Sequence, residues 1–249
     1  MRGLFLVVLI LFFGCSAPQK SDQEIFSEQQ RKVLNPVPEI DLEVQVPALE
    51  HALIDQGLVN LEEVIPGIKV DLKYSTTDNF FGQDVYGDLT RAYLQAEVAE
   101  RLKKAQELLK EVSEDYTLLV YDGVRPASVQ QILWDNLDKP DSVKPLYVAD
   151  PKVGSLHNFG VAVDLTIYDL AADSTLDMGT TYDFFGYAAY PDREKQMLQE
   201  GVISAHQVAN RQILRKVMTG AGFTGIGSEW WHFNAYSRKE AGDKFEIVN

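Results

Sequence analysis

The sequence predicts an α+β fold, because short apolar strands alternate along the chain with amphipathic helices. The clearest helix is expected over residues 91–112, where Leu94, Val98 and Leu102 begin a series of apolar residues spaced three or four apart. The clearest strands are the short apolar stretch 117–121 and the alternating apolar stretch 161–167. With 249 residues and 45% hydrophobic content, the chain can bury the core of one large domain and still carry a tail.

The N-terminus has the pattern of an export signal. Arg2 precedes an apolar run from Leu4 to Phe13 that is too short to span a membrane. Cys15 follows after Gly14 and is the only cysteine, so no disulfide can form within the chain. Its position is similar to that of the acylated cysteine in the lipobox of bacterial lipoproteins, although Phe12 stands where a leucine is usual. We therefore expect an exported bacterial lipoprotein, periplasmic or on the cell surface, and the alternative is a secreted protein with a stray cysteine.

Composition divides the chain into three parts. We expect a signal over residues 1–15, a polar tether rich in Gln, Glu, Ser and Pro over 16–50, and the catalytic domain over 51–249. The formal charge of -14 argues against binding to nucleic acid and against electrostatic binding to anionic lipid, so the expected membrane contact is the lipid on Cys15. The composition does not indicate an oligomeric state.

Within the domain, the remaining elements follow from local patterns. Alternation after Pro66 and Gly67 predicts a strand, and a helix should begin near Ser128. Ser204 should cap a helix that ends at Gly220, and residues 223–233 should form a strand or hairpin. The proline- and glycine-containing stretches 138–154 and 178–187 are expected to be loops, and only a short polar end should follow residue 233.

Two of the four histidines each lie near an acidic residue. His157 precedes a glycine turn and the strand that carries Asp164, and His232 follows Glu229. Two imidazoles and one carboxylate make the ligand set of a catalytic zinc that keeps a fourth position open. We therefore expect one zinc ion per chain, held by His157, Asp164 and His232, with Glu229 as the candidate base.

The other two histidines, His51 and His206, lack such neighbours and are expected to be ordinary residues. Trp230 and Trp231 are expected to pack in the core and exclude water, because large aromatic side chains commonly do so. Arg125 lies where a strand ends and a helix is about to begin, a position from which side chains reach a site. From the residues alone, a surface salt bridge is the simpler interpretation of Arg125.

Taken together, S-x-H-x-x-G-x-A-x-D (residues 155–164), E-W-W-H (229–232) and Y-D-G-x-R-P (121–126) resemble the motifs of the VanX-type D-alanyl-D-alanine dipeptidases. These enzymes are a branch of the zinc D,D-peptidases, which are related to D-Ala-D-Ala carboxypeptidases and to the hedgehog signalling domain. The resemblance extends from about residue 61 to residue 233. It implies helices packed on a central, mainly antiparallel sheet with the zinc in a cleft, and a small D,D-dipeptide as substrate.

The resemblance also implies roles for single residues. His157, Asp164 and His232 match the zinc ligands, Glu229 the general base, and Arg125 the residue that stabilises the oxyanion. Ser155 and Asp183 match positions that help to hold the substrate, Asp183 by pairing with its free ammonium group. One departure is Asn158-Phe159-Gly160 after the first histidine, where some members of the family have a basic residue.

Two alternative functions stay open from the sequence. A D,D- or L,D-carboxypeptidase that trims peptidoglycan peptides would need an open groove and would not require Asp183. A metal-binding module without catalysis would need neither Glu229 nor Arg125, because a structural zinc is normally closed by a fourth protein ligand.

Overall fold

The computed structural model describes residues 46–87 and 89–249, and the account that follows concerns these residues. The predicted signal, Cys15 and most of the predicted tether lie outside them. The first described helix, α2 (Val46–Asp55), crosses residue 51, where the catalytic domain was expected to begin. Within the described part of the chain, no helix has both the length and the apolar character needed to cross a bilayer.

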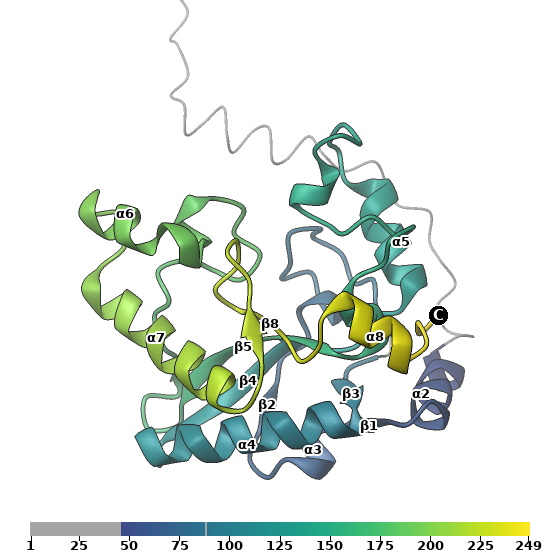
Figure 1. The fold of residues 1–249 in the computed structure, drawn as a ribbon, viewed down its shortest axis with the longest axis horizontal. Coiled ribbons are helices and arrows are strands. Elements are labelled where there is room, and N and C mark those ends of the chain that lie inside the picture. Colours follow the sequence, from purple (N-terminus) through teal and green to yellow (C-terminus); the bar gives the residue numbers. More distant parts are fainter. Residues whose placement is uncertain (1–45, 88) are drawn as a thin grey trace, which may run out of the picture. The chain divides into compact units, whose positions relative to one another are not determined.

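A mainly antiparallel sheet forms the centre of the fold, as predicted (Figure 1). Its strands run in the order β2-β4-β5-β8-β7, and β6 pairs with one end of β5. Only β2 and β4 pair in parallel, whereas all the other neighbours are antiparallel. The strands are β2 (Lys69–Val70), β4 (Tyr116–Asp122), β5 (Ala162–Asp169), β6 (Ser174–Thr175), β7 (Thr224–Gly225) and β8 (His232–Asn234).

The two long strands β4 and β5 carry the core. Leu118, Val120, Val163 and Leu165 are completely buried, and so is Ile167. Successive residues of both strands are buried, so both faces are covered, and the polar residues Asp164 and Thr166 of β5 are buried among apolar ones. Asp164 therefore extends from a strand that lies in the buried core.

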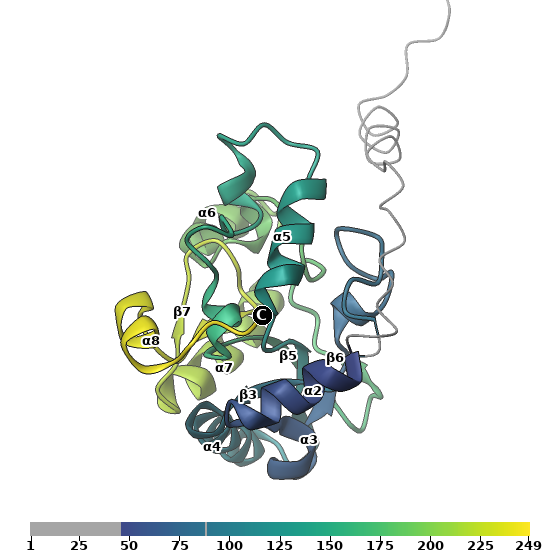
Figure 2. The same ribbon diagram turned by 90° about the vertical axis from the view of Figure 1, so that its right-hand side faces the viewer.

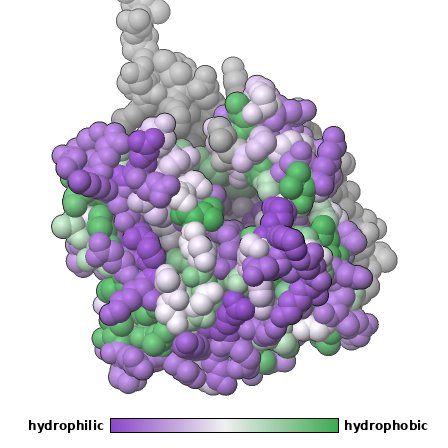
Figure 3. Space-filling view, viewed as in Figure 1, coloured by the Kyte–Doolittle hydropathy of each residue, from purple (hydrophilic) through white to green (hydrophobic). Residues whose placement is uncertain are grey.

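Helices cover the sheet on opposite sides. The long helices α4 (Ala96–Val112) and α7 (Ala205–Gly220) pack against each other, and α4 also packs against β4. Figures 1 and 2 show α3 (Leu61–Val64) on the same side as α4, whereas α5 (Ala127–Asn136) and α6 (Glu194–Gln199) lie on the opposite side. Ser204 caps α7 through a capping box with Gln207, as the sequence predicted. The space-filling view has the direction of Figure 1 and shows that the face turned towards the viewer is hollowed near its centre (Figure 3).

The helix predicted over residues 91–112 was wrong at its start. Residues Tyr93–Gln95 form strand β3, which pairs antiparallel with β1 (Leu58–Asn60), and the helix begins only at Ala96. Tyr93 O accepts a hydrogen bond from Val124 N–H, and Gln95 N–H donates to Gly160 O. These long-range backbone bonds override the helical spacing of the side chains, a competition that local periodicity does not reveal.

The expectation of only a short polar end after residue 233 was also wrong. Helix α8 (Arg238–Lys244) follows, with Ser237 and Glu240 forming a capping box at its start. Val248 is completely buried, its N–H donates to Asn158 O, and its carbonyl accepts from Ala127 N–H. The C-terminal segment therefore supports the turn that carries His157.

Candidate metal centre

His157 is held by a short 3₁₀ helix, η3 (Leu156–Phe159), and not by a strand. Ser155 caps this helix, since its hydroxyl accepts from His157 N–H and its own N–H donates to the side chain of Asn158. Gly160 ends the helix with φ of 66°, a left-handed conformation that favours glycine. The predicted turn through Gly160 is therefore present, and it leads directly into β5.

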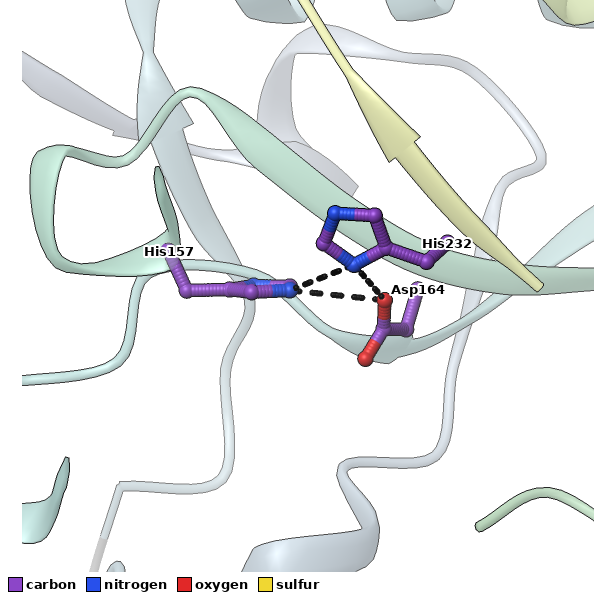
Figure 4. A group of neighbouring side chains, drawn as sticks. All are labelled: His157, Asp164 and His232. Atoms are coloured by element: carbon purple, nitrogen blue, oxygen red, sulfur yellow. Dashed lines mark hydrogen bonds and ion pairs between the residues drawn. The ribbon is translucent and has the colours of Figure 1, made fainter. Parts of the chain in front are cut away.

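Asp164 and His232 are brought together by strand pairing. Asp164 on β5 lies directly opposite His232 on β8 in the antiparallel register. Residues opposite each other in an antiparallel pair project their side chains to the same face. The register of two strands therefore places a carboxylate beside an imidazole, and η3 brings the second imidazole to them (Figure 4).

The three donor atoms have the spacing of a metal site. His157 Nε2 lies 3.2 Å from His232 Nδ1 and 3.4 Å from Asp164 Oδ1, and His232 Nδ1 lies 2.9 Å from Asp164 Oδ1. Ligand atoms at ordinary bond lengths around a tetrahedral zinc lie about 3.3 Å from one another. Within the described residues these three form the group of histidine and acidic side chains that could hold a metal ion.

Hydrogen bonds at the far side of each imidazole fit the same interpretation. His157 Nδ1 lies 2.7 Å from Gly123 O, and His232 Nε2 lies 2.8 Å from Asn234 Oδ1. Each of these oxygens accepts a hydrogen bond, so each ring carries its proton there and turns the lone pair of its other nitrogen towards Asp164. Two lone pairs and a carboxylate oxygen then converge on one point, which a cation can satisfy.

The charges of the side chains also favour a cation at this point. Burial lowers the pKa of His232, but the hydrogen bond to Asp164 and the negative charges of Asp164 and Glu229 together outweigh this effect and raise that pKa to about 9. Burial likewise opposes charge on Asp164, but His157 and His232 hold the pKa of that carboxyl well below its usual range. The site therefore attracts positive charge.

Glu229 lies beside the cluster without joining it. It is half-buried in the loop between β7 and β8, and its Oε2 is 4.0 Å from His232 Nδ1. Burial raises the pKa of Glu229 above the ordinary value for a glutamic acid. The carboxylate is thus near the donor atoms and a better proton acceptor than an exposed glutamate.

Arg125 is buried, so the alternative of a surface salt bridge does not apply. It lies between the end of β4 and the start of α5, as predicted. Its Nε and Nη2 donate to Asp122 Oδ2 at 3.1 and 2.6 Å, and its Nη1 donates to Gln130 Oε1 at 3.1 Å. Its backbone N–H donates to His157 O. The guanidinium is therefore a fixed cation attached to the turn that carries a candidate ligand.

Asp183 lies on the loop between β6 and α6, in a strained backbone conformation with φ of 56°. Tyr74 donates its hydroxyl hydrogen towards the carboxylate, with the oxygen 3.3 Å from Oδ2. Burial and the charge of Asp164 raise the pKa of Asp183 well above its ordinary value. Arg211 of α7 holds this loop, donating to Met178 O at 2.6 Å and to Ala188 O at 2.8 Å.

Ser155, the two other histidines and the two tryptophans lie outside the group of three candidate ligands. Ser155 is buried and its hydroxyl caps η3, so its role towards a substrate stays a prediction. His51 and His206 are exposed and lie outside the cluster, and Trp230 and Trp231 are buried.

Sequence reasoning missed three polar residues that orient the site: Asp122, Tyr182 and Asn234. Asp122 is completely buried and holds Arg125, whereas Tyr182 and Asn234 each hydrogen-bond a candidate ligand. Asp122 belongs to the motif Y-D-G-x-R-P, in which an acidic residue stands three positions before an arginine. This spacing could have identified Asp122 as the partner of Arg125. Tyr182 and Asn234 reach the site through tertiary structure, and nothing in the local sequence marked them.

Comparison with known proteins shows the family to which the chain belongs. Residues 54–247 match the D-Ala-D-Ala dipeptidase family. The chain is 35% identical over 176 residues to the D-alanyl-D-alanine dipeptidase of Escherichia coli, covering 71% of this chain and 83% of the relative. It is 32% identical over 194 residues to the D-alanyl-D-alanine dipeptidase of Enterococcus faecium, covering 71% and 90%. Among solved structures it is similar to the LD-carboxypeptidase LdcB, with 20% identity, a TM-score of 0.40 and coverage of 75% of this chain and 71% of that one.

Proposed function

The chain belongs to the D-Ala-D-Ala dipeptidase family and is a peptidase, and we propose that it hydrolyses the dipeptide D-Ala-D-Ala with one zinc ion. The observation that carries the proposal is the convergence of two imidazole lone pairs and a carboxylate oxygen at the spacing of zinc ligands. His157, Asp164 and His232 would hold the ion. When bound, zinc supplies a Lewis acid that polarises a carbonyl and activates water near neutral pH.

Glu229 is the proposed general base. Its position beside the ligands lets it take a proton from the attacking water, and its raised pKa makes it a stronger acceptor than an exposed glutamate. The same carboxyl can then give that proton to the departing amine of the second D-alanine. One residue would thus serve both halves of the hydrolysis.

Arg125 is the proposed stabiliser of the negative charge that develops on the substrate carbonyl oxygen. Its bonds to Asp122 and Gln130 fix the guanidinium before the substrate arrives. A cation that is already oriented needs no rearrangement as charge develops, which is why such groups contribute strongly to catalysis.

Asp183 is the proposed partner of the free ammonium group of the substrate. Burial disfavours the charged form of this carboxyl and raises its pKa, so pairing with a cation stabilises the carboxylate. The hydroxyl of Tyr74 orients the same carboxylate. A peptide with a blocked or extended N-terminus would leave Asp183 buried without that partner, which opposes binding. This pairing would restrict the enzyme to dipeptides.

Replacing Asp183 with asparagine should therefore lower kcat/KM for D-Ala-D-Ala by about 10- to 100-fold, because hydrogen bonds to charged groups contribute about 1.5–3 kcal/mol. The preference for D-Ala-D-Ala over its N-acetyl derivative should shrink at the same time. Asp173→Asn is the matched control, since Asp173 also has a positive φ of 52° but is exposed in a turn. An Asp183→Asn variant that kept the wild-type preference would contradict the role of Asp183.

We also propose that the chain is anchored to a bacterial membrane through a lipid on Cys15, with the catalytic domain outside the cytoplasm. The support is the sequence pattern at residues 2–15, which lies outside the described residues. Cell fractionation should find the protein with the membranes, and a Cys15→Ser variant should leave the membrane fraction. Recovery of the wild-type protein mainly from the cytoplasm would contradict the anchor.

A further inference from the structure

Tyr182 contacts the candidate metal ligand Asp164 from the side that faces away from the two imidazoles. The hydroxyl of Tyr182 donates to Asp164 Oδ2 at 2.9 Å, whereas Oδ1 lies 2.9 Å from His232 Nδ1 and 3.4 Å from His157 Nε2. The two oxygens of one carboxylate therefore have separate partners. Oδ1 is directed to the metal position, and Oδ2 is occupied by the phenol.

From this arrangement we propose that Tyr182 is a positioning residue, which holds Asp164 so that it offers one oxygen, and not two, to the metal. The inference rests on the proposed zinc site. A ligating carboxylate is free to turn about its terminal bond unless its other oxygen is held. If Asp164 turned so that both oxygens faced the ion, the second would take the open position that a catalytic zinc needs for water and substrate.

The ring of Tyr182 is fixed well enough to direct the carboxylate. Its centroid lies 5.1 Å from that of Tyr121 and 5.4 Å from that of Trp231, both of which are buried. Such edge and tilted contacts stabilise one ring orientation. The loop itself is tied down by Arg211 at residues 178 and 188, and by the Trp230 indole N–H, which donates to Thr180 Oγ1 at 2.8 Å.

The position of Tyr182 in the chain extends its role. It directly precedes Asp183, the proposed partner of the substrate ammonium group. One rigid loop would thus position the carboxylate that binds the N-terminus of the substrate, and it would also orient a metal ligand. This arrangement would fix the distance between the ammonium group and the scissile carbonyl, the spacing of a dipeptide.

The test is the affinity of the protein for zinc, measured by competition with a chromophoric chelator for the wild type and for Tyr182→Phe. The variant keeps the ring and removes the hydroxyl, so its fold should be retained, which the melting temperature of the metal-free protein checks. We expect zinc binding weaker by about 10- to 100-fold, the usual effect of removing a hydrogen-bond partner of a ligand. With cobalt(II) in place of zinc, the visible absorption band should change intensity, because it responds to coordination number.

Tyr121→Phe is the matched control. Tyr121 belongs to the same aromatic cluster, and removing its hydroxyl leaves the Tyr182–Asp164 hydrogen bond in place, so zinc affinity and the cobalt spectrum should stay those of the wild type. If Tyr182→Phe bound zinc as tightly as the wild type and gave the same cobalt spectrum, the positioning role would be wrong. A wild-type protein that bound no zinc would instead overturn the proposed function, so the two failures are distinguishable.

Discussion

Replacing Glu229 with alanine is expected to lower kcat for D-Ala-D-Ala by about 10²- to 10⁴-fold, the usual contribution of a general acid–base group. The variant should retain one zinc ion, because Glu229 lies 4.0 Å from His232 Nδ1 and the three candidate ligands contact one another without it. The measurement pairs steady-state kinetics with the zinc content of the purified protein.

Glu229→Gln provides the control for shape. It keeps the side chain in place but cannot accept a proton, so its kcat should fall by a similar factor with zinc retained. Loss of the metal from either variant would show that Glu229 is a ligand, and a fall in kcat of less than about tenfold in both would remove it from the role of base.

Replacing Arg125 with lysine is expected to lower kcat by about 10²- to 10³-fold, the effect seen when one oriented group that stabilises an oxyanion is removed. Lysine keeps the positive charge beside the buried carboxylate of Asp122, which alanine would leave unpaired. It cannot reproduce the fork of bonds to Asp122 and Gln130 and still face the substrate.

A purely structural role for Arg125 gives a different result. In that case Arg125→Lys would lower the melting temperature while kcat per folded, zinc-loaded molecule stayed close to that of the wild type. Gln130→Leu is a useful companion, because it removes one of the bonds that orient Arg125 and leaves the Asp122 pair intact. A smaller decrease in kcat is expected for this variant.

The grouping of His157, Asp164 and His232 was predictable because these residues lie in two short segments with recognisable local patterns. Six residues lie between His157 and Asp164, a spacing that a glycine turn and one strand fulfil, and His232 begins a strand of the same sheet. The prediction did not include that His157 lies on a 3₁₀ helix and that Asp164 and His232 are opposite each other in register. Register depends on the pairing of distant segments, which a local pattern does not encode.

Most of the parts that sequence reasoning missed depend on contacts between distant segments. The start of α4 is shifted by the hydrogen bonds that Val124 N–H donates to Tyr93 O and that Gly160 O accepts from Gln95 N–H. Tyr182 reaches Asp164 from the loop that Arg211 holds, and no periodicity predicts such a contact. Helix α8 is a different case. The pattern S-x-x-E at residues 237–240 is a capping box and predicts a helix start, although the residues that follow it are mostly polar.

The most direct test of the zinc dipeptidase assignment is the release of D-alanine by the zinc-loaded domain from two substrates. These are D-Ala-D-Ala and a pentapeptide that ends in D-Ala-D-Ala. The assignment predicts that the dipeptide is cleaved, that the pentapeptide is not, and that removal of zinc by a chelator abolishes the activity until zinc is restored. Cleavage of the pentapeptide would contradict it and indicate a carboxypeptidase. Cleavage of neither substrate by protein with zinc bound would indicate a metal-binding module.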